Sequence, residues 1–495
     1  MKLARRVVLI LLISLGLPQF ALAAANDSKI VIAIPNEPPG LDPAMQAPAS
    51  VSEVTWQNVF EGLTKFDPHG RIVPSLAVSW TRPDPNTYIF KLRPGVKFHD
   101  GTPFSSEDVK FSFERAAGPD STSKRKRVFV NFAKIDTPDP LTVKITTKEP
   151  SALLPFFLAE GTAAIESSKS ASNNRSHPIG TGPYKFVSWT RGDSVTLVRY
   201  PDYKGPVTPT IQNVVFRFIS DENAQVLALK GGQVDYLPYM AAADTVKTLK
   251  SDSRFRVSAG TTQGVLFLGF NNKKKPFNDV RVRRALYYAL DPDAINDGAY
   301  GGFAKKPGAQ VTTLNPYFVD VLSGVKYDPE KAKKLLSEAG YPNGFAASFK
   351  VMGNPTYRRA AEIVVAQLSE VGIQTKLEIQ EIPTWMDVVF KHKNYDMTLI
   401  EHREPWAIFN FTDPNYFYQY DNEKFRATMK AVEASKDEDE IRRNMAAAQR
   451  QLLEDAPVVF LDSVPIVGVV NKALTGTRVD YPLPSYPVAE MSWSK

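Results

Sequence analysis

Residues 399–420, with the sequence LIEHREPWAIFNFTDPNYFYQY, concentrate side chains that can bind a small molecule. The four residues 401–404 are Glu, His, Arg and Glu, so two carboxylates, an imidazole and a guanidinium stand together. Seven aromatic residues follow: Trp406, Phe409, Phe411, Tyr416, Phe417, Tyr418 and Tyr420. Charged groups recognise ligand charges, and rings offer apolar or stacking surface. This mixture is unlike the core of a strand or helix, and it predicts a binding surface.

The candidate ligand contacts in this segment are the residues able to pair with charge, hydrogen-bond or stack: His402, Arg403, Glu404, Trp406, Phe409, Asn410 and Tyr416. The amide of Asn410 offers both a donor and an acceptor, so it suits neutral groups such as hydroxyls or amides. The combination predicts a sugar-like, amide-rich or aromatic ligand. The alternative is that the aromatic residues mainly pack the segment against its own domain. For His402, a structural role is favoured over binding of a nickel chelate.

Recognisable catalytic and metal-binding patterns are missing from the sequence. The five histidines (His69, His99, His177, His392 and His402) include no pair at the i, i+3 or i, i+4 spacing of helical metal ligands. There is no cysteine, no G-x-S-x-G nucleophile motif and no P-loop. We therefore expect a binding protein that is not an enzyme and holds no cofactor or metal. An exported hydrolase is the less favoured alternative.

Length and charge set the next limits. The chain has 495 residues, more than one hydrophobic core usually serves, so two or three domains are expected. The formal net charge is +7, without a dense basic stripe, and nucleic-acid binding is not expected.

The first 23 residues have the pattern of a signal peptide. Lys2, Arg5 and Arg6 are basic, residues 7–17 are apolar, and residues 21–23 are Ala-Leu-Ala, which predicts cleavage before Ala24. The apolar run is too short to cross a membrane, and without cysteine a lipid anchor on an N-terminal cysteine is impossible. The mature protein is therefore expected to be soluble, exported and not lipid-anchored. Removing these three basic residues lowers the net charge from +7 to +4.

Helices and strands interleave in the second half of the chain. Residues 280–290 and 332–339 carry apolar stripes at helical spacing, and Asp328-Pro329 is typical of a helix start. Residues 361–371 repeat the helical pattern before Gly372, and residues 373–379 alternate as a strand does. Earlier, Ser105 or Ser106 is expected to cap a helix. These patterns predict α/β domains.

Several segments together resemble the family 5 extracellular solute-binding proteins of ABC transporters, which include dipeptide, oligopeptide and nickel binders. The segments are GRIVPSLAVSW, LRPGVKFHDGTPFSSEDVKFSFER, GTGPYKFVSW, ALKGGQVDYLP, FNDVRVRRALYYALD and YDPEKAKKLLSEAGYPNGF. The resemblance implies an α/β periplasmic-binding-protein fold with two hinged lobes, an extra subdomain in the first lobe, and a ligand enclosed between the lobes. It also implies a periplasmic, monomeric receptor that delivers a small molecule to a membrane permease driven by ATPase subunits.

By the same resemblance, lobe I spans residues 24–262, with an inserted subdomain at about 64–177. Lobe II spans 263–471, and residues 472–495 return to lobe I. Residues 261–272 and 458–471 are the expected hinge strands. In lobe I, the resemblance brings Ala49, Ser50 and Val51 to the ligand, and Trp56 and Glu61 are weaker candidates for the cleft wall.

The resemblance also identifies two substituted positions. In the peptide binders, an aspartate three residues before an acidic-Pro pair holds the ligand ammonium; here the pair is Asp413-Pro414 and that position is Asn410. The position of the arginine that holds the carboxylate in dipeptide binders is Val351. A buried charge without a partner is costly, so a dipeptide held at both charged ends is not expected. A sugar or a metal chelate such as nickel stays open as the ligand, as does a receptor that signals or acts as a chaperone.

Overall fold

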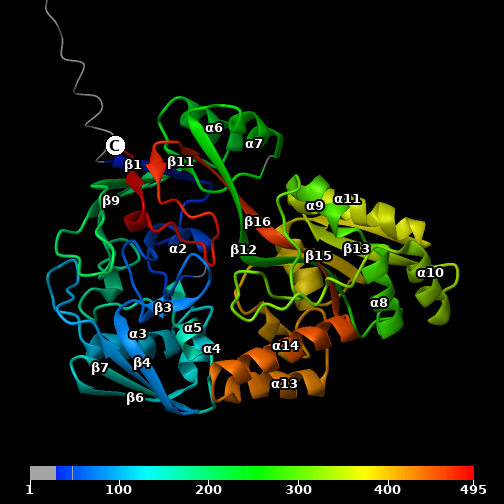
Figure 1. The fold of residues 1–495 in the computed structure, drawn as a ribbon, viewed down its shortest axis with the longest axis horizontal. Helices are drawn as coiled ribbons and strands as arrows, with labels where there is room; N and C mark the ends of the chain where they lie inside the picture. The colour runs from blue at the N-terminus through cyan, green and yellow to red at the C-terminus, as the bar shows by residue number, and fades with distance from the viewer. Residues whose placement is uncertain (1–28, 47, 242, 495) are drawn as a thin grey trace, which may run out of the picture.

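The computed structural model describes residues 29–46, 48–241 and 243–494. The expected signal peptide, residues 1–23, lies outside them. Figure 1 shows two groups of elements joined by two long strands, β12 (Phe255–Phe270) and β16 (Val458–Asn471). We call the elements from β1 to α7, with the C-terminal segment from β17, lobe I, and the elements from α8 to α14 lobe II. The expected α/β fold with two lobes is confirmed.

Within the described residues, ten strands form one mixed sheet that runs through both lobes. Its order is β14 (Ile373–Gln380), β13 (Phe345–Met352), β15 (Met397–His402), β12, β16, β11 (Tyr236–Leu237), β1 (Lys29–Ile34), β10 (Asn213–Phe218), β9 (Ser194–Arg199) and β8 (Tyr184–Thr190). Strands β12 and β16 pair antiparallel along most of their length. Their register shifts between Thr261 and Val265, close to the lobe boundary expected at residue 262. The exact boundaries stay a prediction.

The inserted part of lobe I is built on a second sheet. Its four antiparallel strands lie in the order β4 (Ala77–Asp84), β5 (Thr87–Leu92), β7 (Thr142–Thr147) and β6 (Phe132–Asp139). Helix α3 (Ser106–Ala117) packs on this sheet, and α4 (Lys126–Val130) and α5 (Leu154–Phe157) follow. The Asp108 carboxylate accepts from the Ser105 amide at 2.9 Å, so Ser105 caps α3 as one of the two expected serines. We call residues 64–177 the inserted subdomain.

The remaining elements of lobe I are short and lie before, within and after the inserted subdomain. They are α2 (Ala49–Thr55), β2 (Thr64–Phe66), β3 (Ile72–Pro74), α6 (Glu222–Lys230), α7 (Ala243–Lys250), β17 (Leu474–Thr475) and β18 (Ser492–Trp493). Short 3-10 turns lie at Gly161–Ala163, Ala171–Asn173 and Val488–Glu490. The amide of Asn58 donates to the Tyr486 carbonyl at 3.0 Å, which fastens the C-terminal segment to lobe I.

Lobe II is mainly helical around its three strands. Its helices are α8 (Val280–Ala289), α9 (Pro292–Tyr300), α10 (Pro329–Glu338), α11 (Pro355–Glu370), α12 (Ile382–Trp385), a π-helix at Met386–Lys391, a 3-10 helix at Ala407–Thr412, α13 (Glu423–Ala434) and α14 (Glu438–Asp455). Asp328 caps α10 by accepting from the Lys331 amide at 2.9 Å, as the sequence predicts.

Helix α11 begins earlier than its apolar pattern indicates. Asn354 caps it and Pro355 occupies its first turn, so the helix starts six residues before position 361. Across the described ranges, no helix combines the length and apolar character required to cross a bilayer.

Candidate ligand-binding site

The end of β15 places a charged group of lobe II toward lobe I. Side chains alternate along a strand, so Glu401 and Arg403 share one face and His402 lies on the other. Glu401 is 8% exposed, and its carboxylate accepts a hydrogen bond from the Tyr300 hydroxyl at 2.5 Å. Arg403 donates to it through Nε at 2.8 Å and Nη2 at 2.6 Å. Tyr357, near the start of α11, lies within electrostatic range of Glu401, whose charge raises the pKa of the Tyr357 hydroxyl in addition to burial. These contacts fix the direction of the guanidinium.

Arg403 meets lobe I at the opposite side of the cleft. Its side chain is 57% exposed, and it lies close enough to Tyr239, which follows β11, to lower the pKa of that hydroxyl against the effect of burial. Glu53, one turn into α2, lies within electrostatic range of Arg403. Burial raises the pKa of Glu53 to about 7, and the charge of Arg403 opposes that shift. No ion pair within 4.0 Å joins Glu53 to Arg403 among the described residues, so the two groups lie within electrostatic range of one another without direct contact.

Aromatic hydroxyls surround this pair of charges. Tyr486, from the C-terminal segment of lobe I, is buried, and the charges of Glu53 and Arg403 both influence its pKa, which burial raises. Next to Tyr239 and Tyr300 lies a cavity of about 20 Å³, enclosed by both lobes and by β16. It is lined by Tyr239, Met240, Ala241, Val246, Ala299, Tyr300, Phe303, Thr356, Pro465 and Val467. We call Glu53, Tyr239, Tyr486, Glu401, Arg403, Tyr300 and Tyr357 the charged cleft.

Of the residues expected from segment 399–420, Arg403 lies in the charged cleft, whereas His402 points to the other face of β15. The His402 ring packs edge-on against Phe267 at 4.8 Å between centroids. Burial lowers the pKa of His402 to about 4, so its imidazole is neutral at pH 7. Its Nδ1 has no hydrogen-bond partner among the described residues. Its contact with a ligand stays a prediction.

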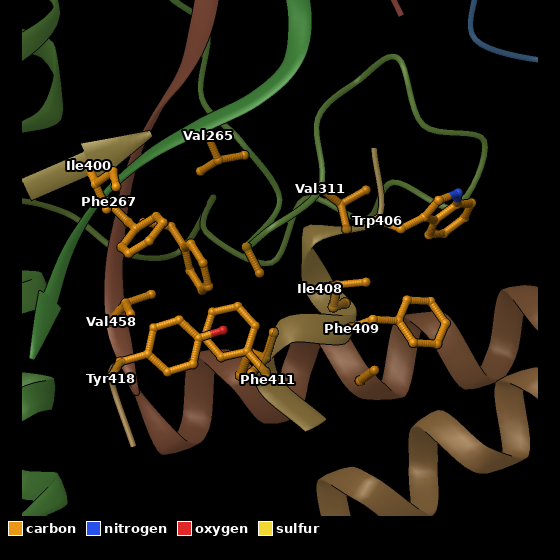
Figure 2. Packing of buried hydrophobic residues seen from close by; sticks show 14 of the residues in the cluster. Val265, Phe267, Val311, Ile400, Trp406, Ile408, Phe409, Phe411, Tyr418 and Val458 are labelled. Carbon is orange, nitrogen blue, oxygen red and sulfur yellow. The ribbon is translucent and has the colours of Figure 1, made fainter. Parts of the chain in front are cut away.

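Trp406 is buried between the lobes, toward the inserted subdomain. It is 1% exposed, and its indole lies 3.9 Å from the Phe156 ring and 6.0 Å from the Phe157 ring, measured between centroids. Phe409 is also buried and stands beside Trp406 (Figure 2). The indole Nε1 has no partner among the described residues, so it could still donate a hydrogen bond. A ligand contact of Trp406 or Phe409 stays a prediction.

The other candidates of the segment form a short polar chain. Asn410 donates to the Tyr416 hydroxyl at 3.4 Å, and the same hydroxyl lies 3.4 Å from Nε2 of His402. Glu404 is exposed and lies within electrostatic range of Arg125 in lobe I. The structure thus brings Asn410, Tyr416 and His402 together, and it separates them from Arg403 by the thickness of β15. Their roles toward a ligand stay predictions.

The lobe I candidates lie at the start of α2. Ala49 is exposed, whereas Ser50 and Val51 are buried. Glu53 follows on the same short helix and was not predicted from the sequence. An acidic residue two positions after the expected ligand contacts at residues 49–51 was the signal that could have identified it. Glu61 is buried and accepts from the Thr181 hydroxyl at 3.0 Å, so its carboxylate is already partnered.

The two positions that the resemblance assigns to the charged anchors of dipeptide binders, Asn410 and Val351, are neutral here. Val351 lies in β13 and is fully buried in the core of lobe II. No group of three or more His, Cys, Asp or Glu side chains in the described part of the chain is arranged to hold a metal ion.

Comparison with known proteins identifies the family. The family model described as "Bacterial extracellular solute-binding proteins, family 5 Middle" matches residues 71–427. The chain belongs to family 5 of the bacterial extracellular solute-binding proteins. It is a solute-binding component of an ABC importer, as the sequence predicts, and its relatives are transport receptors, not enzymes.

Curated relatives of this family 5 protein carry the name glutathione-binding protein GsiB. The protein from Pectobacterium atrosepticum is 32% identical over 360 residues, which cover 72% of this chain and 69% of the relative. The protein from Escherichia coli O157:H7 is 32% identical over 379 residues, 74% of this chain and 72% of the relative.

Solved structures agree on the fold. The binding protein AgaA from A. tumefaciens R10, in complex with agropinic acid, is 27% identical, has a TM-score of 0.76, and the match covers 94% of this chain and 99% of that one. The periplasmic binding protein DppA from Helicobacter pylori, in complex with the peptide STSA, is 24% identical, with a TM-score of 0.78 over 96% of this chain and 100% of that one. The second likeness supports the fold alone.

Proposed function

We propose that this importer component captures a small peptide-like or amino-acid-derived solute in the charged cleft and delivers it to an inner-membrane permease. The observation that carries the proposal is the pair of opposite charges on the two lobes, Glu53 and Arg403. A ligand group with both an ammonium and a carboxylate satisfies both residues when the lobes close. An ammonium facing Glu53 and a carboxylate facing Arg403 describe an α-amino-acid head group.

This head group agrees with the loss of the two dipeptide anchors. In an ordinary dipeptide the ammonium and the carboxylate stand at opposite ends, where Asn410 and Val351 offer no charge. In glutathione the γ-linkage leaves an ammonium and a carboxylate on the same carbon. The 32% identical relatives named for glutathione binding make γ-glutamyl compounds the preferred ligand class. The 27% identical protein solved in complex with agropinic acid makes that compound the second one to test.

The charged cleft contains four tyrosines, and we propose a role for two of them. We propose that Tyr239 and Tyr357 hydrogen-bond to polar groups of the solute, because both lie within electrostatic range of Arg403 and Glu401. Asn410, His402 and the start of α2 at residues 49–51 remain proposed secondary contacts beyond the head group, and Trp406 remains a candidate contact.

Calorimetric titration with a matched pair of tripeptides tests the proposal. Glutathione and its α-linked isomer Glu-Cys-Gly have the same composition, but only glutathione has the free head group. We expect glutathione to bind about 100-fold more tightly, because an unpaired charge at a buried site costs roughly 3 kcal/mol. Equal or tighter binding of the isomer would exclude head-group recognition. If neither tripeptide binds but agropinic acid does, the γ-glutamyl class is wrong.

We also propose that the protein is exported to the periplasm, acts as a monomer and works without a lipid anchor. The basic and apolar pattern of residues 1–23 supports export. N-terminal sequencing of protein from the periplasmic fraction should find a start at or near Ala24. Recovery of Met1 from that fraction would contradict the signal peptide.

A further inference from the structure

A second contact between the lobes lies outside the charged cleft. We call it the aromatic contact: Phe156 and Phe157 of α5 in the inserted subdomain meet Trp406 and Phe409 of lobe II. Trp406 is its centre, because its ring touches both phenylalanines of lobe I and also Tyr317 of lobe II, at 6.0 Å between centroids. Figure 2 shows Trp406 and Phe409 near one another, on the same side of Ile408.

Polar groups surround the aromatic contact and join the same two parts of the molecule. The Ala152 amide donates to the Glu433 carbonyl of α13 at 2.9 Å. The Arg82 guanidinium donates to the carbonyl of Ser435, just after α13. The guanidinium of Arg127 lies over the Phe409 ring, 5.7 Å from its centroid. The inserted subdomain is therefore docked on lobe II by backbone and side-chain contacts as well as by rings.

The aromatic contact is separated from the hinge. Figure 1 shows α4 and α5 beside α13 and α14 at the lower end of the molecule, away from the part of β12 and β16 that enters lobe I. None of its four residues belongs to the charged cleft. Rings that meet across two lobes can only do so when the lobes are together, so their contact energy favours the closed form.

We propose that Trp406 is a positioning residue that holds the lobes closed through Phe156 and Phe157, and thereby sets ligand affinity without touching the ligand head group. The proposal depends on closure of the two lobes and not on the identity of the solute. Each closed molecule would gain the aromatic contact whether or not a solute is bound. Its loss raises the open fraction, and the apparent affinity falls by the same factor as the closed population.

One feature of Trp406 points to a competing role. Its Nε1 is buried and has no partner among the described residues, so a ligand acceptor could receive it. The two roles differ in what they require of the side chain. Positioning requires the ring, whereas ligand contact requires the N–H group. Trp406→Phe keeps a ring and removes the N–H, and Phe156→Ala removes the opposite wall and leaves the N–H in place.

The interlobe distance in the absence of ligand gives the direct test. The chain has no cysteine, so exposed lysines on the two sides, Lys144 of the inserted subdomain and Lys376 of lobe II, can be changed to cysteine and labelled with a dye pair. Energy transfer in single molecules then reports the open and closed fractions. Trp385→Ala is the matched control, because Trp385 is equally buried but its ring neighbours, Phe390 and Phe417, are in lobe II.

We expect Trp406→Ala and Phe156→Ala each to lower the closed-to-open ratio about tenfold. The double variant should fall little further, because both changes remove one shared contact. Trp406→Phe should recover most of the closed fraction, and Trp385→Ala should leave it unchanged. Should Phe156→Ala fail to fold, Phe156→Leu removes the ring while keeping apolar volume. An unchanged distance distribution in Trp406→Ala and Phe156→Ala would overturn the proposal.

Titration with glutathione distinguishes this proposal from the ligand class. Under the positioning role, Trp406→Ala and Phe156→Ala weaken glutathione binding by the same factor. If Trp406→Phe loses as much affinity as Trp406→Ala while Phe156→Ala binds normally, the indole N–H contacts the ligand and the positioning role is wrong. If glutathione does not bind the wild-type protein at all, the proposed ligand class fails, and the ligand-free distance test still decides the role of Trp406.

Discussion

The two lobes meet through two surfaces of opposite character. In the charged cleft, Glu53 and Arg403 lie within electrostatic range without an ion pair, and we propose that a polar group of the solute binds between them. In the aromatic contact, Phe156 and Trp406 touch directly, with 3.9 Å between ring centroids. Charged groups supply specificity because each rejects a ligand without the matching charge, and apolar rings supply attraction that does not depend on the ligand. In our two proposals, the charged cleft selects the solute and the aromatic contact favours closure of the lobes.

Replacing Arg403 should have the largest effect. Arg403→Gln removes the cation that faces the ligand carboxylate, and affinity for glutathione should fall about 100-fold or more. The change also leaves the Glu401 carboxylate with only tyrosine partners, so Glu401→Gln/Arg403→Gln serves as the variant that restores a neutral site. Calorimetry measures both, with Arg281→Gln, exposed and paired with Asp279, as the control. Full affinity in the double variant would show that the cleft does not select by charge.

The proton on Glu53 should make binding depend on pH. The folded-state pKa of Glu53, about 7, lies above the usual value of 4.5, so the protonated carboxyl stabilises the ligand-free protein relative to the ionised one. This contribution to stability is full below pH 4.5 and is lost as the pH rises through 7. A ligand ammonium needs the ionised form, so affinity should increase up to tenfold per pH unit below 7 and level off above it.

Glu53→Gln should bind about tenfold more weakly at pH 8 and show a flat profile between pH 6 and 8. The control is N-acetylated glutathione, which lacks the ammonium and should gain nothing from ionised Glu53. A Glu53→Gln profile that still rises with pH would assign the dependence to another group.

Substitution at Asn410 tests whether this position, which matches the ammonium-binding aspartate of the peptide binders, lies near the solute. Asn410→Asp replaces the donor to Tyr416 with a carboxylate, and binding of glutathione should weaken severalfold if Asn410 lies near the solute. New binding of simple dipeptides by the variant would identify position 410 as a latent ammonium site. Unchanged binding of both would remove Asn410 from the ligand contacts.

The smallest effect is expected at the edge of the aromatic contact. Burial raises the pKa of Glu433 to about 7, while Arg127 opposes the shift. Opening the lobes exposes this carboxyl and lowers its pKa, so closure is favoured at low pH and weakens as pH rises through 7. Glu433→Gln should be closed a few-fold more often than the wild type at pH 8, and equally often at pH 5, in the interlobe distance measurement. A wild-type distribution at both values would exclude Glu433 from closure.

Elements with local signals were predictable from the sequence. Residues 458–471 form one strand as expected, and Asp328 caps α10, because apolar runs and capping residues act over a few positions. The predicted start of α11 was wrong by six residues, because the first turn of the helix lacks the apolar pattern and only Asn354-Pro355 indicates where the helix begins.

The charged cleft was only partly predictable. Arg403 stands in the segment whose composition indicated binding, but its neighbours Glu53, Tyr239 and Tyr357 come from three separate places in the chain. The sequence also gives no sign that Trp406 meets Phe156. Such contacts depend on the relative position of two lobes, and no local pattern encodes that position.

The compounds released from purified protein test the central claim most directly. Wild-type protein and Arg403→Gln would be isolated from the native host, denatured, and the released small molecules identified by mass spectrometry. Selection by the charged cleft predicts that wild-type protein releases a compound with a free α-amino-acid head group, and that Arg403→Gln protein does not. Release of the same compound from both proteins, or of a wild-type ligand with neither an amino nor an acidic group, would contradict it.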